Sequence, residues 1–277
     1  MIRAGVMGWP VAHSRSPAVH GFWLRHYGIA GEYLLLPVSP ERLEAALRAL
    51  PGEGFAGCNL TLPLKERALA LVDHADATAH RIGAVNTVIV ASDGTLEGRN
   101  TDAFGFHANL AASLPEWRAA AGPAVVLGAG GAARAVVAAL IDQGAPEIRL
   151  ANRHRARAEA LAEALGGPIT IRDWEEREAA LEDAALLVNA TSLGQSGQKP
   201  LLLALDRLPP AAVVNDIVYV PLETPLLAAA RARGNPAVDG LGMLLHQARP
   251  GFAAWFGVMP EVTPELRQHV LASFAAR

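Results

Sequence analysis

Lysine is rare in this chain, and one of its two lysines stands where a proton donor would be useful. The 277 residues include 24 Lys plus Arg, and only Lys65 and Lys199 are lysine. Lys65 begins a helix-like segment at the carboxyl end of an expected strand, where ligands of open α/β sheets bind. Lysine can act as a general acid or base where its surroundings lower its pKa. Lys65 is therefore a candidate catalytic residue, with a surface helix position as the alternative, while Lys199 precedes Pro200 and is expected in a loop.

Two polar clusters lie where loops leave apolar runs. In the first, at 13–17, Ser14 and Ser16 could cap the following helix or could together bind a substrate carboxylate. The second combines 84–87 with 99–102. Its Asp102 could cap a helix, or it could orient the Lys65 ammonium and help to transfer a proton. Spacing does not show whether Lys65 and Asp102 meet.

A glycine turn at 128–134 separates an expected strand from an expected helix. Gly128 permits the tight turn, Gly130 lets a pyrophosphate approach the backbone, and Ala133 allows close packing of helix on strand. The N–H groups at the helix start would bind the anion. Such a turn is weak evidence alone, but the strand before it, the helix after it and the next strand supply the context of a dinucleotide site.

Arginines follow the second strand of this unit, in the sequence Asn152-Arg153-His154-Arg155-Ala156-Arg157. A site for NAD usually presents Asp or Glu there, whereas three guanidinium groups suit the 2′-phosphate of NADP. Arginine near a helix N-terminus also opposes the helix dipole. The sequence predicts NADP, with a solvated helix start as the alternative.

Other sets of residues that could deliver a proton to a substrate are absent from the sequence or less well supported by it. The single cysteine, Cys58, cannot provide the usual ligands of a zinc dehydrogenase. No lysine stands four residues beyond Tyr27, Tyr33 or Tyr219, so a Tyr-x-x-x-Lys pair is absent from the sequence. Histidine stays an option, because the chain has nine.

The elements that must position these residues alternate between strand-like and helix-like runs, which is typical of α/β domains with a largely parallel sheet. The first unit is expected to have strands at 2–7, 33–38 and 57–62, helices at 16–27, 40–50 and 64–72, and an edge hairpin at 85–90 and 95–98. The second is expected to have strands at 124–127, 147–151, 186–189 and 213–217, and helices at 131–143 and 155–165. Residues 114–123 read as a connection. Helices at 241–254 and 264–275 could cover either unit.

Composition narrows the function classes. The length suits one large or two medium domains. A net charge of −3 gives no sign of the basic surface that binds nucleic acid or an anionic membrane. One cysteine excludes an intramolecular disulfide and a thiolate zinc cluster. The N-terminus lacks the apolar core of a secretion signal, and the stretch 119–141 contains Arg134 and four glycines. We expect a soluble, cytoplasmic protein with no bound metal, no nucleic-acid partner and no membrane partner.

Eight motifs together resemble the shikimate dehydrogenase (shikimate/quinate dehydrogenase) family, over essentially the whole chain. They are HSRSP at 13–17, NLTLPLKERA at 59–68, GAVNT at 83–87, GRNTDAFGF at 98–106, GAGGAAR at 128–134, NATSLG at 189–194, DIVYVPLETPLL at 216–227 and GLGMLLHQA at 240–248.

The resemblance implies two α/β domains with a cleft between them. A substrate-binding catalytic domain would span 1–103 and be rejoined by the helices of 241–277, and a Rossmann NADP-binding domain would span 104–240. The implied activity is the NADPH-dependent, reversible reduction of 3-dehydroshikimate to shikimate, in chorismate and aromatic amino-acid biosynthesis. The implied partner is thus a small molecule, and a homodimer is one option for the assembly.

The resemblance also implies roles for individual residues. Lys65 would be the acid/base and Asp102 its partner. The residues implied to bind the substrate are Ser14, Ser16, Asn59, Thr61, Asn86, Asp102, Tyr219 and Gln247. The residues implied to bind the cofactor are Gly128, Ala129, Gly130, Gly131, Ala132, Asn152, Arg153, Arg157, Thr191, Ile217, Gly240 and Met243.

The chain departs from the family pattern at His154, Ala77 and Gln195, where Thr, an acid and Met are frequent. None of these touches the implied pair of Lys65 and Asp102. Two alternatives stay open: a quinate or dual quinate/shikimate dehydrogenase, and a catalytically silent NADP-binding module. Retention of the lysine, the aspartate and the serine pair speaks against the silent module.

Overall fold

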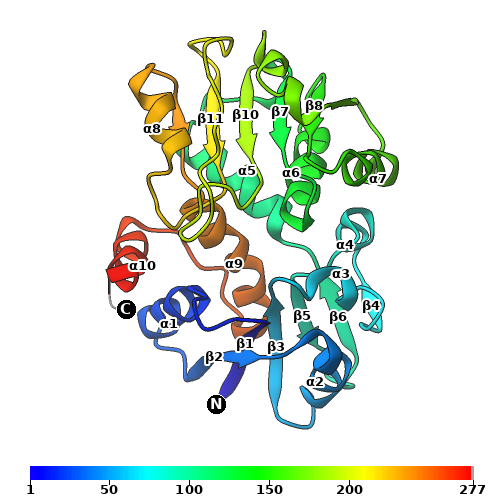
Figure 1. Cartoon of the computed structure of the whole chain (residues 1–277). Coiled ribbons are helices and arrows are strands. Elements are labelled where there is room, and N and C mark those ends of the chain that lie inside the picture. The colour runs from blue at the N-terminus through cyan, green and yellow to red at the C-terminus, as the bar shows by residue number, and fades with distance from the viewer. Residues whose placement is uncertain (276–277) are drawn as a thin grey trace. The chain divides into compact units, whose positions relative to one another are not determined.

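The computed structural model describes residues 1–275 of the chain. It divides into two compact units, one made of Met1–Gly105 with the chain from Leu244 onward, the other of Phe106–Met243. Each unit contains one six-stranded sheet with helices packed around it (Figure 1). The predicted fold class, two α/β units, is confirmed. Of the segment predicted at 241–277, residues 276 and 277 lie outside the described residues.

The first sheet is mixed, with the strand order β2-β1-β3-β5-β6-β4. Its strands are β1 (Ile2–Gly8), β2 (Gly31–Pro37), β3 (Phe55–Leu60), β4 (His74–Ala75), β5 (Thr87–Val90) and β6 (Leu96–Arg99). β1 runs parallel to β2 and β3, while β5 is antiparallel to β3 and to β6. The predicted hairpin is therefore β5–β6, but its place at the sheet edge is wrong, because the two-residue strand β4 pairs with β6.

The helices of the first unit come from both ends of the chain. They are α1 (Ser16–His26), α2 (Leu43–Ala49), α3 (Lys65–Ala68), α4 (Ala77–Ile82) and α10 (Pro264–Ala275), with a 3-10 turn η1 (Pro40–Arg42). α5 (Asp102–Ser113) and α9 (Leu241–Phe256) each carry residues of both units. α3 ends at Ala68, so it is shorter than the helix predicted at 64–72.

The C-terminal helices complete the core of the first unit. The indole of Trp255, on α9, donates to the carbonyl of Val88 at 3.0 Å. The indole of Trp23, on α1, donates to the carbonyl of Glu261 at 2.9 Å. The chain from Leu244 onward thus belongs to the first unit, where it contacts α1 and β5.

The second sheet is parallel throughout, with the order β12-β11-β10-β7-β8-β9. Its strands are β7 (Ala124–Leu127), β8 (Ile148–Ala151), β9 (Ile169–Arg172), β10 (Leu186–Asn189), β11 (Val213–Asp216) and β12 (Ala237–Val238). The helices are α6 (Gly131–Asp142), α7 (Arg155–Leu165) and α8 (Pro225–Ala232), with 3-10 turns η2 (Ala119–Ala121), η3 (Trp174–Glu176) and η4 (Ala179–Leu181). The strand order reverses between β7 and β10, and ligands of doubly wound sheets bind at such a point.

Neither a membrane span nor a metal cluster is found in the described part of the chain. No helix within residues 1–275 is long and apolar enough to cross a membrane. The same residues hold no group of three or more His, Cys, Asp or Glu side chains placed to bind a metal ion.

Candidate active site

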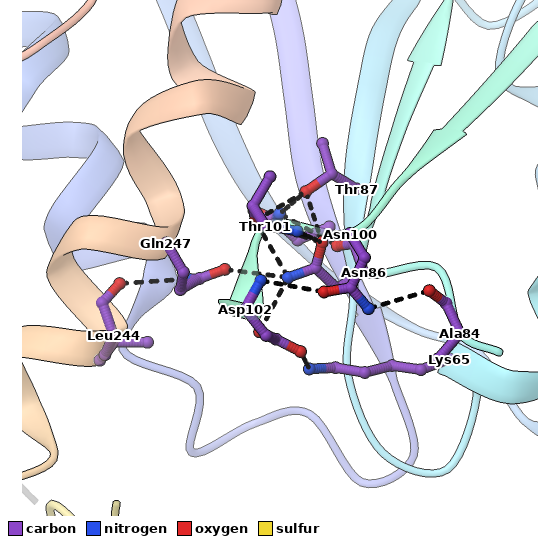
Figure 2. Close-up of polar contacts among 10 residues, drawn as sticks. Lys65, Ala84, Asn86, Thr87, Asn100, Thr101, Asp102, Leu244 and Gln247 are labelled. Atoms are coloured by element: carbon purple, nitrogen blue, oxygen red, sulfur yellow. Dashed lines mark hydrogen bonds and ion pairs between the residues drawn. The ribbon is translucent and has the colours of Figure 1, made fainter. Parts of the chain in front are cut away.

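Lys65 and Asp102 form an ion pair in the first unit. Lys65 is the first residue of α3, just after β3, and Asp102 is the first residue of α5, just after β6. The Lys65 Nζ lies 2.6 Å from the Asp102 Oδ2, and the two side chains are 18% and 6% exposed. Figure 2 shows the pair beside a group of amide and hydroxyl side chains. The structure thus brings together two residues whose meeting the sequence could not establish.

The Asn86 amide holds the other oxygen of Asp102. The Asn86 Nδ2 lies 2.8 Å from the Asp102 Oδ1, 3.0 Å from the Thr101 Oγ1 and 3.4 Å from the Gln247 Oε1 (Figure 2). The Asn86 Oδ1 accepts the backbone N–H of Thr101 at 2.9 Å and the Thr87 hydroxyl at 3.0 Å. Because both ends of the amide are engaged, its orientation is set, and Asp102 faces Lys65 with its remaining oxygen.

Asn59 and Thr61, at the end of β3, are used differently. Asn59 is buried, and its Oδ1 accepts the Tyr33 hydroxyl at 2.6 Å. Its Nδ2 donates to the Asn86 carbonyl and to the Thr87 hydroxyl, each at 3.1 Å. The half-buried hydroxyl of Thr61 has no hydrogen-bond partner within the described residues. Asn59 therefore braces its neighbours, whereas Thr61 keeps a free polar group four residues before Lys65.

The serine pair lies at the start of α1. The hydroxyls of Ser14 and Ser16 are 3.3 Å apart, and the backbone N–H of Ser16 also points to the Ser14 Oγ at 3.3 Å. Arg15 occupies the N-cap position with no side-chain capping hydrogen bond. Neither serine therefore occupies the N-cap position, although the Ser14 hydroxyl lies within reach of the first N–H of the helix. Arg15 instead donates to the Ser273 carbonyl at 2.7 Å.

In the second unit, the glycine turn after β7 has the backbone that a phosphate site requires. Gly128 has φ +113°, and a Cβ there would lie 2.7 Å from the Ala190 carbonyl oxygen, so only glycine fits. Gly130 is the N-cap of α6 without a capping side chain, and nothing lies within 4 Å of a Cβ built there. The first N–H groups of α6 are therefore open to an anion.

The three arginines after β8 are not equivalent. Arg155 bonds Glu159 at 2.8 Å and Asp173 at 2.5 Å. Arg153 and Arg157 are exposed, and their guanidinium groups have no partner in the described part of the chain. Arg155 is already neutralised by two carboxylates. Of the three arginines predicted to suit a 2′-phosphate, only Arg153 and Arg157 therefore have a free guanidinium group in the described residues.

A buried carboxylate, Asp216, was missed in the sequence. It ends β11, and its Oδ1 accepts the Asn189 amide at 2.9 Å and the Val218 N–H at 3.0 Å. Its Oδ2 accepts the Thr224 hydroxyl at 2.7 Å. Burial raises the pKa of Asp216 to about 6. Asn189 also accepts the Thr191 hydroxyl at 2.7 Å, so Asp216 ties together the loops that follow β10 and β11.

The remaining implied cofactor residues also lie in the second unit. Ile217 and Gly240 are in close contact, since a Cβ on Gly240 would lie 2.2 Å from the Ile217 carbonyl oxygen. Met243 is buried on α9, and Asn152 donates to the His154 carbonyl at 2.9 Å. Tyr219 is half-buried in the loop after β11, so its implied share in carboxylate binding stays a prediction.

Comparison with known proteins gives one consistent family. Residues 6–88 match the model described as Shikimate dehydrogenase substrate binding domain, and residues 110–200 match Shikimate / quinate 5-dehydrogenase. A shikimate dehydrogenase (NADP(+)) from Paramagnetospirillum magneticum is 65% identical over 269 residues, covering 97% of this chain and 98% of that protein.

Two solved structures are similar over nearly their full length. Shikimate 5-dehydrogenase from Thermus thermophilus, in complex with NADP(H) and shikimate, is 41% identical with a TM-score of 0.87, covering 100% of both chains. Quinate dehydrogenase from Corynebacterium glutamicum, in complex with NAD, is 33% identical with a TM-score of 0.91, covering 98% of this chain and 99% of that one. The chain described here belongs to the shikimate dehydrogenase family.

Proposed function

We propose that this protein is an NADP-dependent shikimate dehydrogenase that interconverts 3-dehydroshikimate and shikimate. The family assignment supports the reaction class and the cofactor. The observation that carries the chemistry is the ion pair of Lys65 with Asp102, 2.6 Å long and set among amide and hydroxyl groups that suit a polyhydroxylated ring.

Lys65 is proposed to move the proton. Reduction of a ketone places negative charge on its oxygen, and a positioned ammonium can donate a proton there. Asp102 keeps the Lys65 Nζ in place, and the Asn86 amide holds Asp102 in turn. In the reverse direction, neutral lysine would take the proton from the hydroxyl.

The polar groups of the proposed site divide into two sets of substrate contacts. Ser14 and Ser16 present two adjacent hydroxyls, which suit a carboxylate. The ring hydroxyls are assigned to Thr61, Asn86, Asp102 and Gln247. Tyr219 is kept as a proposed additional contact to the carboxylate. We assign Asn59 a supporting place, because both ends of its amide are engaged by protein groups.

The second unit offers groups that fit a dinucleotide phosphate. Bound NADPH would supply the hydride. The uncapped start of α6 and the glycine turn, with Ala129 and Ala132, would hold the pyrophosphate. Arg153 and Arg157 would pair with the 2′-phosphate beside Asn152. Thr191, Ile217, Gly240 and Met243 are proposed to line the nicotinamide end.

A quinate dehydrogenase is the second candidate, because one similar structure is a quinate dehydrogenase in complex with NAD. The free arginines after β8 favour NADP and so favour the first candidate. A cytoplasmic location and a homodimer are also proposed.

The deciding experiment is the absorbance of reduced cofactor, with purified protein, shikimate or quinate, and NADP or NAD. We expect fast reduction of NADP with shikimate and slow reduction in the other three mixtures. Fast reduction of NAD with quinate would reverse the ranking. Cofactor binding without turnover in any mixture would favour a silent module.

A further inference from the structure

We propose that Tyr33 is a positioning residue, whose buried hydroxyl orients the Asn59 amide and, through it, the groups that hold Asp102 and Lys65. The inference rests on the proposed function and adds to it a residue outside the implied site. Tyr33 lies within β2 and is 8% exposed. Its Oη donates to the Asn59 Oδ1 at 2.6 Å.

The Tyr33 hydroxyl completes the one orientation of the Asn59 amide that the Asn86 carbonyl also favours. With its Oδ1 accepting from Tyr33, Asn59 turns its Nδ2 toward the Asn86 carbonyl and the Thr87 hydroxyl, each at 3.1 Å. The reversed amide would set its oxygen against the Asn86 carbonyl oxygen, two acceptors without a proton between them. Tyr33 and Asn86 therefore favour the same orientation.

A directional series of hydrogen bonds runs from there to the catalytic pair. The Thr87 Oγ1 accepts from Asn59 and donates to the Asn86 Oδ1 at 3.0 Å. The Asn86 Nδ2 donates to the Asp102 Oδ1 at 2.8 Å, and the Asp102 Oδ2 accepts from Lys65 at 2.6 Å. Every donor in this series has a matched acceptor, so loss of the first donor weakens the constraint on the groups that follow it.

The Tyr33 ring is itself held by packing. It stacks on the His20 ring with centroids 3.9 Å apart and planes 1° from parallel, and it also contacts Trp255. His20 is fully buried, and burial lowers its pKa to about 3, so the stacked imidazole is neutral near neutral pH. Replacing Tyr33 by phenylalanine would keep this stack and remove only the hydroxyl.

The test compares Tyr33→Phe with Tyr27→Phe. The Tyr27 hydroxyl accepts the backbone N–H of Glu261 at 3.2 Å in the same unit, so its removal also costs one hydrogen bond. For Tyr33→Phe we expect kcat/KM for shikimate to fall about tenfold or more, because a buried acceptor is left unpaired. The KM for NADP should not change. Tyr27→Phe should keep wild-type kinetics.

A second variant distinguishes positioning from simple loss of stability. Thr87→Val breaks the series one step later, and the double variant Tyr33→Phe/Thr87→Val should be no slower than Thr87→Val alone. The inference would be overturned if the losses of kcat/KM in the two single variants multiply in the double variant. It would also be overturned if folded Tyr33→Phe has wild-type kinetics. If Tyr33→Phe does not fold, a wild-type kcat/KM for Thr87→Val would overturn it as well. Wild-type protein without shikimate turnover would instead refute the proposed function.

Discussion

Asp102 holds Lys65 at 2.6 Å with one carboxylate oxygen while Asn86 holds its other oxygen at 2.8 Å. The carboxylate is thus fixed from the side away from the lysine, and its side chain is 6% exposed against 18% for Lys65. The ammonium is the more accessible member of the pair, which fits the proposed contact of Lys65 with substrate.

Replacing Lys65 should remove turnover more than binding. We expect Lys65→Ala to lower kcat by about 10²- to 10⁴-fold, because a positioned acid/base contributes that much. The KM for shikimate should change far less, since the serine pair and the Asn86 group remain. Steady-state kinetics with shikimate and NADP measure both constants.

Two further variants control this result. Lys65→Arg keeps a cation beside Asp102 but cannot lose its proton at neutral pH, so it should be almost as slow as the alanine variant. Lys199→Ala, which removes the other lysine, should keep wild-type kcat. Comparable turnover in Lys65→Ala would rule out the assigned role.

The two free arginines after β8 should set the cofactor preference. Replacing Arg153 and Arg157 by alanine should raise the KM for NADP by about 10- to 100-fold, because each can form a charged hydrogen bond to the 2′-phosphate. The KM for NAD, which lacks that phosphate, should stay the same. Initial rates over a range of each cofactor test this.

Arg155→Ala is the matched control, since Arg155 is held by Glu159 and Asp173. It should leave the ratio of NADP to NAD activity unchanged. An equal loss in Arg155→Ala would show that net charge, and not the two free guanidinium groups, selects the cofactor.

Asp216 should make the second unit less stable as the pH rises. Its pKa of about 6 in the folded protein exceeds the ordinary 3.8, so the folded state binds more protons than the unfolded state between those values. The stabilisation is complete below about pH 4 and is lost as the pH rises through about 6. A shift of about two pKa units corresponds to about 3 kcal/mol of unfolding free energy.

Asp216→Asn removes this titration and can still accept from Asn189 and Val218. Its unfolding free energy relative to wild type should therefore rise by up to about 3 kcal/mol between pH 4 and pH 7. Denaturant unfolding at several pH values gives the difference. Buried His20 and half-buried His246, whose lowered pKa values of about 3 and about 4 destabilise the fold in acid, are present in both proteins. Their effect therefore cancels in the difference between variant and wild type. A constant difference would contradict the raised pKa.

Arg15 should support the serine pair through the C-terminal helix. Its guanidinium donates to the Ser273 carbonyl at 2.7 Å and lies over the Phe274 ring, with 5.0 Å from the Arg15 Cζ to the ring centroid. We expect Arg15→Ala to raise the KM for shikimate by about 2- to 10-fold, the value of one hydrogen bond, with the KM for NADP unchanged.

Arg25→Ala is the control for Arg15→Ala, because Arg25 makes another contact between α1 and α10. Its Nη2 lies 3.3 Å from the His269 Nε2. That variant should leave the KM for shikimate as it is. A matching rise in both variants would mean that general loosening of α10, and not the Arg15 anchor, is responsible.

Local patterns were sufficient for the long, periodic elements. The helix expected at 155–165 is α7 (Arg155–Leu165), and the strand expected at 186–189 is β10 (Leu186–Asn189). A strand that is buried on both faces has a continuous run of apolar residues, which can be recognised from the sequence alone. β4 and β12 have two residues each. Two residues are too few to show the alternation of apolar and polar side chains that marks a strand in a sequence. β4 and β12 are strands because they pair with β6 and β11.

The site was predictable as separate residues and not as an arrangement. Lys65 and Asp102 each follow a strand, but 37 residues separate them, and their meeting depends on how β3, β5 and β6 pair. Tyr33 in a strand reads as an ordinary core aromatic. Asp216 reads as the polar end of an apolar run, and only the folded loops show that three donors surround its carboxylate.

The discontinuity of the first unit has a consequence for protein synthesis. As the chain leaves the ribosome, residues 106–243 are complete before any residue from Leu244 onward appears. Domains fold as units during synthesis, so the second unit has all its strands while the first still lacks α9 and α10. The aromatic side chain of Trp23, whose ring centroid lies 5.3 Å from that of Phe252, lacks this contact until then. The part of the protein that begins first is therefore the part that finishes folding last.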